Sequence, residues 1–189
     1  DNRRRIVEAL LALTARDGWQ AVTLSSLAAE TGLALSEIYV HFPSRQAILA
    51  AFFDGIDSNV LANTPKAILN EPPRDRLFDI LMRRFDTLNE HKDAIAAIVR
   101  GTCNDPLMIL CGAPRFMQSI AAMLEAAGLS SAGCAGTVKA NGLAVIYLNA
   151  FRVWLRDDTQ DMSKTMATLD KSLRQADRLA AMLFIRRSA

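Results

Sequence analysis

The sequence has few of the residues from which catalytic and metal sites are built. Its 189 residues include two histidines, His41 and His91, and three cysteines, none of them in a C-x-x-C pair. It contains neither a G-x-S-x-G elbow nor a phosphate-binding loop, so the usual nucleophile–base pairs and metal-ligand sets cannot be assembled. We therefore expect no enzyme activity, no metal site and no cofactor.

Disulfide frameworks and membrane spans are also not indicated. An odd number of unpaired cysteines predicts that Cys103, Cys111 and Cys134 are free, buried thiols in a reducing compartment. The uncharged stretch 140–151 is too short to cross a bilayer. No secretory segment follows Asp1, and because the chain lacks a starting methionine we expect further residues ahead of it. These features predict a cytoplasmic globular protein.

The first fifty residues lack an excess of basic charge. They contain five arginines and five acidic residues, whereas a DNA-binding domain usually carries net positive charge. The few arginines lie mainly at helix starts. Arg3, Arg4 and Arg5 are in the first turn of the first predicted helix, and Arg45 is at the start of the fourth. A nucleic-acid contact at these positions would depend on few cations.

The clearest pattern that is present is a pair of short helices joined by a glycine turn. Thr23 can cap the first helix, and Leu27 lies on its buried face. Gly32 ends that helix, because glycine adopts the left-handed conformation without steric cost. The second helix covers residues 35–41, and Pro43 prevents its continuation. The pattern predicts a helix-turn-helix.

The rest of the chain reads as further helices, without strand-like alternation or internal repeats. Ile6, Leu10 and Leu13 form the buried face of the first helix, which Gly18 ends and Trp19 covers. A kink is expected near Pro114, and residues 128–136 read as a loop of small residues. The expected helices are residues 3–17, 44–62, 74–91, 93–102, 106–127, 137–156 and 163–185, besides the two of the helix-turn-helix.

The N-terminal motifs resemble those of the TetR family of transcriptional repressors. The resemblance covers residues 3 to about 53. It rests on Asp17-Gly18-Trp19, Ala21-Val22-Thr23-Leu24, Leu27-Ala28, Gly32, Ile38-Tyr39, His41-Phe42 and Pro43-Ser44-Arg45. It implies an all-α fold of about nine helices, with a DNA-binding domain at residues 1–50 and a ligand-binding and dimerisation domain at residues 51–189.

The resemblance implies that the second helix of the motif enters the major groove of double-stranded DNA. Tyr39 and His41 would contact the backbone, with ring packing and helix capping as their alternative roles. Leu35 could read only apolar features such as a thymine methyl, and Glu37 could accept from cytosine but would repel phosphate. The expected DNA-binding residues are Arg3, Arg4, Arg5, Thr23, Ser25, Leu35, Ser36, Glu37, Tyr39, His41 and Arg45.

The second domain is rich in methionine and aromatic residues that could line a site for a small apolar effector. Core packing is the alternative role for each of them. The candidates are Phe78, Met82, Phe85, Met108, Phe116, Met117, Met123, Tyr147, Phe151 and Trp154. His91, Asn141, Asn149 and Arg152 could orient a polar head group. Arg152 with Asp157 and Asp158 also reads as a salt-bridge cluster at a helix end.

The C-terminal segment 171–187 is a basic amphipathic helix, with five bases and one acidic residue. Its apolar stripe favours a homodimer contact, and a position on an anionic membrane is the alternative. A second resemblance, over residues 154–158 and 165–170, is to ubiquinone-biosynthesis accessory proteins, which share the TetR-like fold and bind lipid. It keeps open a lipid- or isoprenoid-binding function without DNA binding.

These observations together predict a homodimeric, ligand-responsive repressor that binds a near-palindromic operator. The last two helices of each chain would form a four-helix bundle with those of the partner. An effector held among the fifth to eighth helices would favour a state in which the fourth helix has moved the two DNA-binding domains out of register with the operator.

Overall fold

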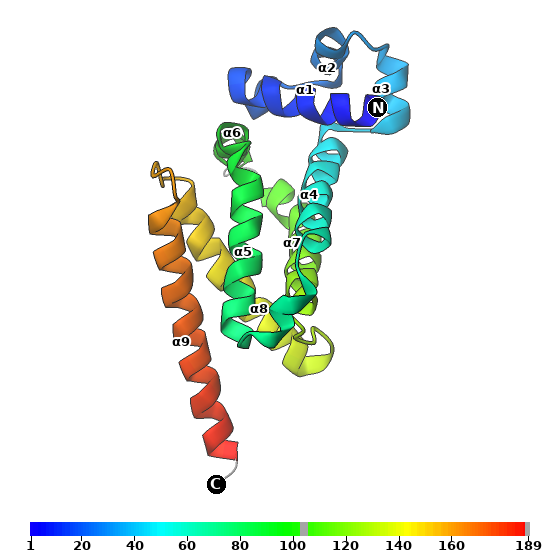
Figure 1. Cartoon of the computed structure of the whole chain (residues 1–189). Coiled ribbons are helices and arrows are strands. Elements are labelled where there is room, and N and C mark those ends of the chain that lie inside the picture. The colour runs from blue at the N-terminus through cyan, green and yellow to red at the C-terminus, as the bar shows by residue number, and fades with distance from the viewer. Residues whose placement is uncertain (103–105, 188–189) are drawn as a thin grey trace. The chain divides into compact units, whose positions relative to one another are not determined.

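The chain is helical throughout the part that the structure describes. The computed structural model describes the backbone of residues 1–102 and 106–187, and the side chains of residues 1–102 and 110–180. The elements within these ranges are α1 (Asn2–Asp17), η1 (Trp19–Ala21), α2 (Leu24–Thr31), α3 (Leu35–His41), α4 (Arg45–Ala62), η2 (Lys66–Asn70), α5 (Pro73–Asn89), α6 (Lys92–Thr102), α7 (Pro106–Ala126), α8 (Gly133–Trp154) and α9 (Ser163–Arg187) (Figure 1). Nine α-helices without a strand in these ranges confirm the predicted all-α class.

The helices form two compact units. One unit comprises residues 1–59 and 87–113, and the other comprises residues 60–86 and 114–189. The helices α4, α5 and α7 each begin in one unit and end in the other, and the boundary in α7 falls between Ala113 and Pro114. The helix assignment of α7 continues through Pro114. In the first unit, α1 packs on α2 and α6.

The core of the first unit follows the predicted pattern. Ile6, Leu10 and Leu13 of α1 are buried together with Trp19. Gly101 of α6 lies against the Trp19 side chain, and a Cβ atom at Gly101 would come within 2.9 Å of the Trp19 Cβ atom. The Gln20 side chain also donates to the Gly101 carbonyl, at 2.8 Å. The absence of a side chain at Gly101 thus allows α6 to approach η1 closely.

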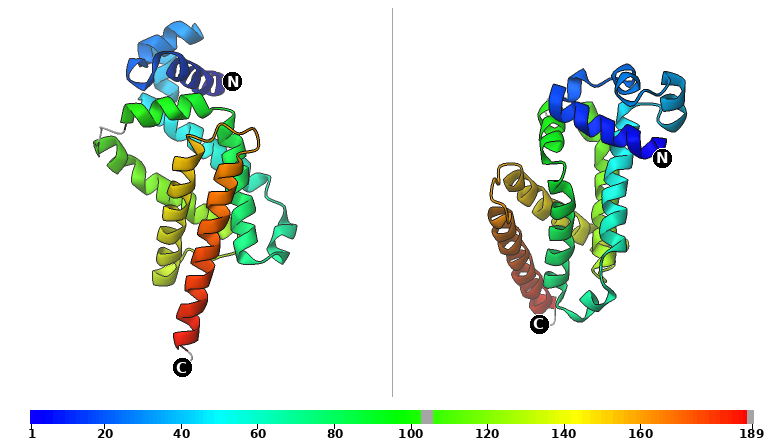
Figure 2. Two further views of the ribbon diagram at one scale, coloured as in Figure 1. Left: turned by 90° about the vertical axis from the view of Figure 1, so that its left-hand side faces the viewer. Right: turned by 45° about the horizontal axis from the view of Figure 1, so that its top comes forward.

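In the second unit, α8 and α9 pack side by side (Figure 2). The predicted loop 128–136 is too long, because α8 already begins at Gly133, four residues before the expected start at Thr137. Gly136 is buried within this stretch, and a Cβ atom on it would come within 2.1 Å of the Ser131 backbone, so only glycine fits there. The short helix η2 was also not expected from the sequence.

Two cysteines differ from expectation. Cys111 and Cys134 are free thiols, as predicted, but both are exposed rather than buried. Cys103 lies outside the described residues. Among the described residues, no helix combines the length and the hydropathy that a membrane crossing requires.

Asp157 connects the end of α8 to the start of α9 through a buried carboxylate. Its Oδ2 atom accepts from the backbone N–H and the hydroxyl of Thr165, both at 2.8 Å, and its Oδ1 atom accepts from the Thr159 hydroxyl at 2.6 Å. Burial opposes ionisation, but these hydrogen bonds outweigh it and hold the pKa of Asp157 well below its usual range. The interpretation of Asp157 as part of a salt-bridge cluster with Arg152 is therefore replaced by a helix cap.

We expect Asp157→Ala to lower the free energy of unfolding by about 2–4 kcal/mol, because it removes the cap and leaves buried donors of Thr165 unpaired. Asp157→Asn, which keeps one acceptor oxygen, should cost less. Since the pKa is lower in the folded state than in the unfolded state, the carboxylate's contribution is complete above about pH 5 and declines as the pH falls. Urea titrations at neutral and acidic pH measure both effects. Asp158→Ala, at an exposed neighbour, is the control, and an equal loss in that variant would contradict the assignment.

Candidate nucleic-acid interface

The helix-turn-helix forms as the sequence predicts. The Thr23 hydroxyl accepts from the Ser26 backbone N–H at 3.0 Å, and the Ser26 hydroxyl accepts from the Thr23 backbone N–H at 2.9 Å, which is a reciprocal capping box. Gly32 has φ 68° and ends α2 in the left-handed conformation. Leu27 and Ile38 are fully buried and hold α2 and α3 against the rest of the unit. The capped turn and these buried contacts therefore hold α3 in a fixed orientation within the unit.

Most of α3 faces solvent. Tyr39 is 61% exposed and Val40 82% exposed, and Leu35 and Ser36 are exposed as well. The Tyr39 side chain is thus mostly in solvent rather than buried in the core. His41, in the last turn, is half-buried. These side chains are available to a ligand without any rearrangement of the core.

Glu37 has a local role in this helix. Its Oε2 atom accepts from the backbone N–H of Ala34 at 2.8 Å. This bond satisfies a donor at the start of α3, where Ala34 has no side chain that could cap the helix. The carboxylate is therefore engaged with the start of its own helix, which sequence reasoning about base contacts did not anticipate.

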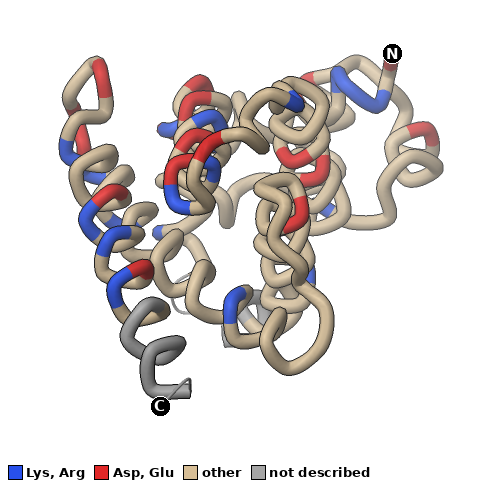
Figure 3. The backbone as a smooth tube through the Cα atoms, turned by 60° about the horizontal axis from the view of Figure 1, so that its bottom comes forward, with Lys and Arg blue, Asp and Glu red and all other residues tan. Residues whose placement is uncertain are grey.

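The predicted phosphate-binding arginines all make contacts within the first unit. The Arg5 guanidinium donates to the Thr31 carbonyl at 2.7 Å, and that of Arg3 lies 4.5 Å from the centroid of the Phe42 ring. Arg4 pairs with Glu8 at 2.7 Å on an exposed surface. All three arginines are exposed, and they form a basic stretch beside the N-terminus (Figure 3). They combine packing roles with access to solvent.

Arg45 stabilises the junction between η1 and α4. Its Nη1 atom donates to the carbonyls of Trp19 and Val22, at 2.8 and 3.0 Å. The guanidinium lies 4.7 Å from the centroid of the Trp19 ring, which is a cation–π distance. Loss of this side chain would remove packing and hydrogen bonds as well as a charge, so an Arg45 variant cannot isolate a phosphate contact.

Thr23 and Ser25 lie at the start of α2. Ser25 is exposed, whereas the Thr23 hydroxyl is used by the capping box. The structure thus places Ser25, Leu35, Ser36, Tyr39 and the N-terminal arginines on the surface of one compact unit.

The second unit gathers five of the predicted effector-lining residues into one aromatic cluster. The Phe85 and Tyr147 rings stack with centroids 5.2 Å apart, and Phe116 and Phe151 lie 5.8 and 6.0 Å from Tyr147. Trp154 completes the cluster at 5.3 Å from Phe151. We name these five residues the aromatic cluster.

Buried methionines and a buried cation belong to the same unit as the aromatic cluster. The buried guanidinium of Arg84 lies 5.0 Å from the centroid of the Tyr147 ring. Met82 and Met123 are buried in the same unit, and Phe78 and Met117 are half-buried. Met108 lies outside the residues whose side chains are described. Burial of this kind fits both core packing and an apolar site, so the effector role of these residues stays a prediction.

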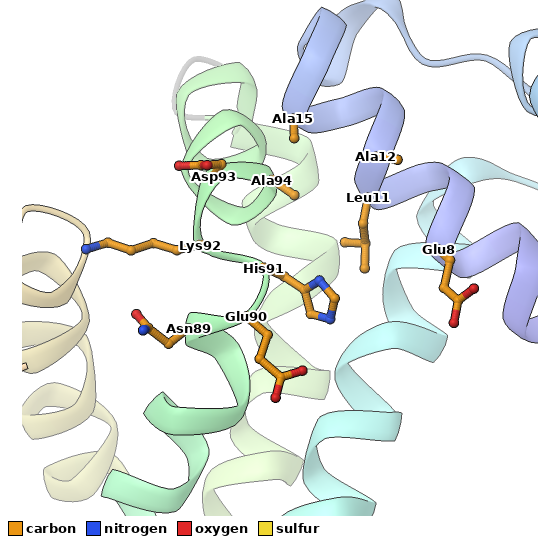
Figure 4. A pocket seen from close by; sticks show the side chains of 10 residues that line it. All are labelled: Glu8, Leu11, Ala12, Ala15, Asn89, Glu90, His91, Lys92, Asp93 and Ala94. Carbon is orange, nitrogen blue, oxygen red and sulfur yellow. The ribbon is translucent and has the colours of Figure 1, made fainter. Parts of the chain in front are cut away.

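A separate hollow of about 330 Å³ lies in the first unit, between α1 and the junction of α5 with α6 (Figure 4). Its lining includes the carboxylates of Glu8, Glu90 and Asp93. His91 also lines it and contacts the Phe52 ring edge-on, with centroids 5.3 Å apart. His91 thus belongs to a different unit from the aromatic cluster. Among the described residues, no group of three histidine, cysteine or acidic side chains could hold a metal ion.

Comparisons with known proteins agree with this geometry. Residues 6–52 match the family model of bacterial regulatory proteins, tetR family. An uncharacterized HTH-type transcriptional regulator of Bacillus subtilis, YerO, is 26% identical over 102 residues, which are 52% of this chain and 35% of that protein. The matched region thus spans about a third of that relative's length.

The whole chain shares its fold with solved TetR-type structures. A TetR transcriptional regulator from Nitrosomonas europaea has a TM-score of 0.79 at 24% identity, covering 94% of this chain and 98% of that one. The Bacillus subtilis regulator FadR, solved in complex with stearoyl-CoA, has a TM-score of 0.63 at 14% identity, covering 90% and 97%. The resemblance predicted from the N-terminal motifs is thereby confirmed, as is the fold.

Proposed function

Since its N-terminal segment belongs to the TetR family, we propose that the chain is a DNA-binding transcriptional regulator that acts as a homodimeric, effector-responsive repressor in the cytoplasm. The observation that carries the proposal is the exposed face of α3, held by the buried Leu27 and Ile38 and a capped turn. A short helix projecting from a rigid base is the geometry with which helix-turn-helix proteins read the major groove.

Phosphate contacts would come from groups around α3 rather than from a broad basic surface. Tyr39 and Ser25, which carry hydroxyls, are exposed residues, and Arg3 and Arg4 are exposed at the start of α1. Hydroxyls and arginines are the usual partners of phosphate oxygens. Because the first fifty residues carry no net charge, we expect a shallow dependence of affinity on salt.

A homodimer would be built from α8 and α9. Apolar side chains at helical spacing are exposed on α8, including Val138, Val145 and Leu148. On α9, Met166 and Leu179 are exposed as well. A two-fold contact would bury both copies of this surface at once. It would also present two α3 helices to a near-palindromic site.

The effector would be a small apolar molecule that contacts the aromatic cluster. Packed aromatic rings and buried methionines favour ligands with hydrocarbon character, and a structural relative was solved in complex with stearoyl-CoA. Such a ligand can change DNA affinity only if it binds the two conformations of the protein unequally. By linkage, operator DNA must then change effector affinity by the same factor.

The test is selection of genomic fragments by the full-length protein at low salt, followed by anisotropy titration of the enriched duplexes. We expect a few fragments to bind at least about 1000-fold more tightly than random DNA. A thermal-shift screen with fatty acids and quinones supplies the effector, which should then alter the affinity for those fragments. Ligand binding without any selective DNA binding would refute the regulator and favour the lipid-binding alternative.

A further inference from the structure

The exposed face of α3 has an unusual composition for a DNA-reading surface. Leu35, Ser36, Tyr39 and Val40 lie on one side of the helix, spaced by one, three and four residues, and Ile38 is buried on the other side. Val40 is the most exposed large apolar residue that we find in the described part of the chain. Val40 therefore contributes little to the core of its unit.

This face lacks the side chains that usually read purines. Guanine is read by bidentate arginine or lysine, and adenine by bidentate asparagine or glutamine. None of these occurs between Leu35 and His41. The Oε2 atom of Glu37, a residue that could accept from cytosine, is bonded to the backbone N–H of Ala34, which ties this carboxylate to the start of α3. The Ser36 hydroxyl is the other exposed polar group in the first turn of α3, so this face offers few hydrogen bonds for direct readout.

Apolar side chains have one partner in the major groove, the C5-methyl group of thymine. Val40 is 82% exposed and Leu35 48% exposed, so each can bury part of its surface against such a methyl group. We propose that α3 recognises its DNA site mainly through contacts with thymine methyl groups, and that Val40 and Leu35 are the specificity-determining residues. This inference rests on the proposed DNA binding. The ligand class is B-form DNA whose half-sites carry thymines opposite these two side chains.

The experiment removes single methyl groups from the DNA. The full-length protein first selects its preferred duplexes from a random pool. Each thymine is then replaced by deoxyuridine, which keeps the base pair and loses only the methyl, and affinity is measured by fluorescence anisotropy. Burial of one methyl group predicts a loss of about fourfold at each contacted thymine. At the thymine that faces Val40, the Val40→Ala variant should bind the two duplexes equally.

Two variants complete the design. Leu35→Ala should abolish the deoxyuridine effect at a different thymine from Val40→Ala, since the two side chains lie at different places on the helix. Leu61→Ala, at an exposed leucine of α4, is the matched control and should keep every thymine dependence. Circular dichroism verifies that each variant stays helical.

The outcomes separate this inference from the proposed function. Selective binding that is insensitive to deoxyuridine at every position would refute methyl readout while leaving the regulator intact. An A·T preference that survives removal of all methyl groups would indicate recognition of groove shape and would also refute it. Absence of any selected duplex would refute the proposed function itself.

Discussion

Ser36→Glu is expected to lower the affinity for the selected DNA by at least about 100-fold. Ser36 is an exposed residue in the first turn of α3, so the new carboxylate would face the negatively charged groove without disturbing the core. Like charges brought together in an interface cost several kcal/mol, and 100-fold corresponds to about 2.7 kcal/mol. Anisotropy titration of the wild type and the variant on the same duplex measures the ratio.

Ser58→Glu supplies the matched control for this prediction. It makes the same change at an exposed position of α4, thirteen residues beyond the start of that helix. Its affinity should stay within about threefold of the wild type, because exposed substitutions away from an interface are energetically small. If both variants bound DNA like the wild type, α3 would not be the reading helix.

The double variant Val145→Glu/Leu179→Glu is expected to turn a dimer into a monomer, with a dimer dissociation constant raised at least about 100-fold. Val145 on α8 is 68% exposed and Leu179 on α9 is 62% exposed, so neither is needed for the fold of one chain. Each change places a carboxylate on both sides of a two-fold contact, where unpaired desolvated charge is costly. Sedimentation velocity at micromolar concentration distinguishes the two masses.

Asp158→Lys, at an exposed position between α8 and α9, is the control and should remain dimeric. Leu173 is less suitable as a probe of the interface than its sequence pattern indicates, because it is buried within the single chain. A double variant that sediments as a dimer with normal helix content would show that α8 and α9 do not form the contact.

Much of the first unit could be predicted from local sequence. Thr23, Gly32 and Pro43 act on their immediate neighbours, through a cap, a left-handed turn and a missing N–H group. The buried positions Ile6, Leu10 and Leu13 follow from helical periodicity alone. Such signals are carried within a few residues, so they survive without knowledge of the tertiary fold.

The parts that could not be predicted depend on residues distant in sequence. Arg45 reaches back to the carbonyls of Trp19 and Val22, and Gly101 packs on Trp19 from a helix eighty residues away in the chain. The cap that Asp157 provides is a more local feature. Asp157 lies only eight residues before Thr165, which is in the first turn of α9, so the sequence could have indicated this cap. Because Arg152 lies close to Asp157 in the sequence, the sequence analysis predicted a salt bridge between them instead.

The candidate site was predictable in its location and less so in its chemistry. The exposed face of α3 follows from the motif, but Val40 was not selected from the sequence, because a valine in a short helix reads as core. Its neighbour Ile38 is the core residue, and only the exposed fractions distinguish the two. The capping role of Glu37 likewise needed the geometry of the turn.

The most direct test of the account is hydroxyl-radical footprinting of the full-length protein on its selected genomic fragment. Two copies of α3 related by a two-fold axis should protect two segments about one helical turn apart, on one face of the duplex. Both protections should disappear together in Ser36→Glu and persist in Ser58→Glu. Uniform weak protection along the fragment, or a pattern unchanged in Ser36→Glu, would contradict the proposal that this chain reads DNA through α3.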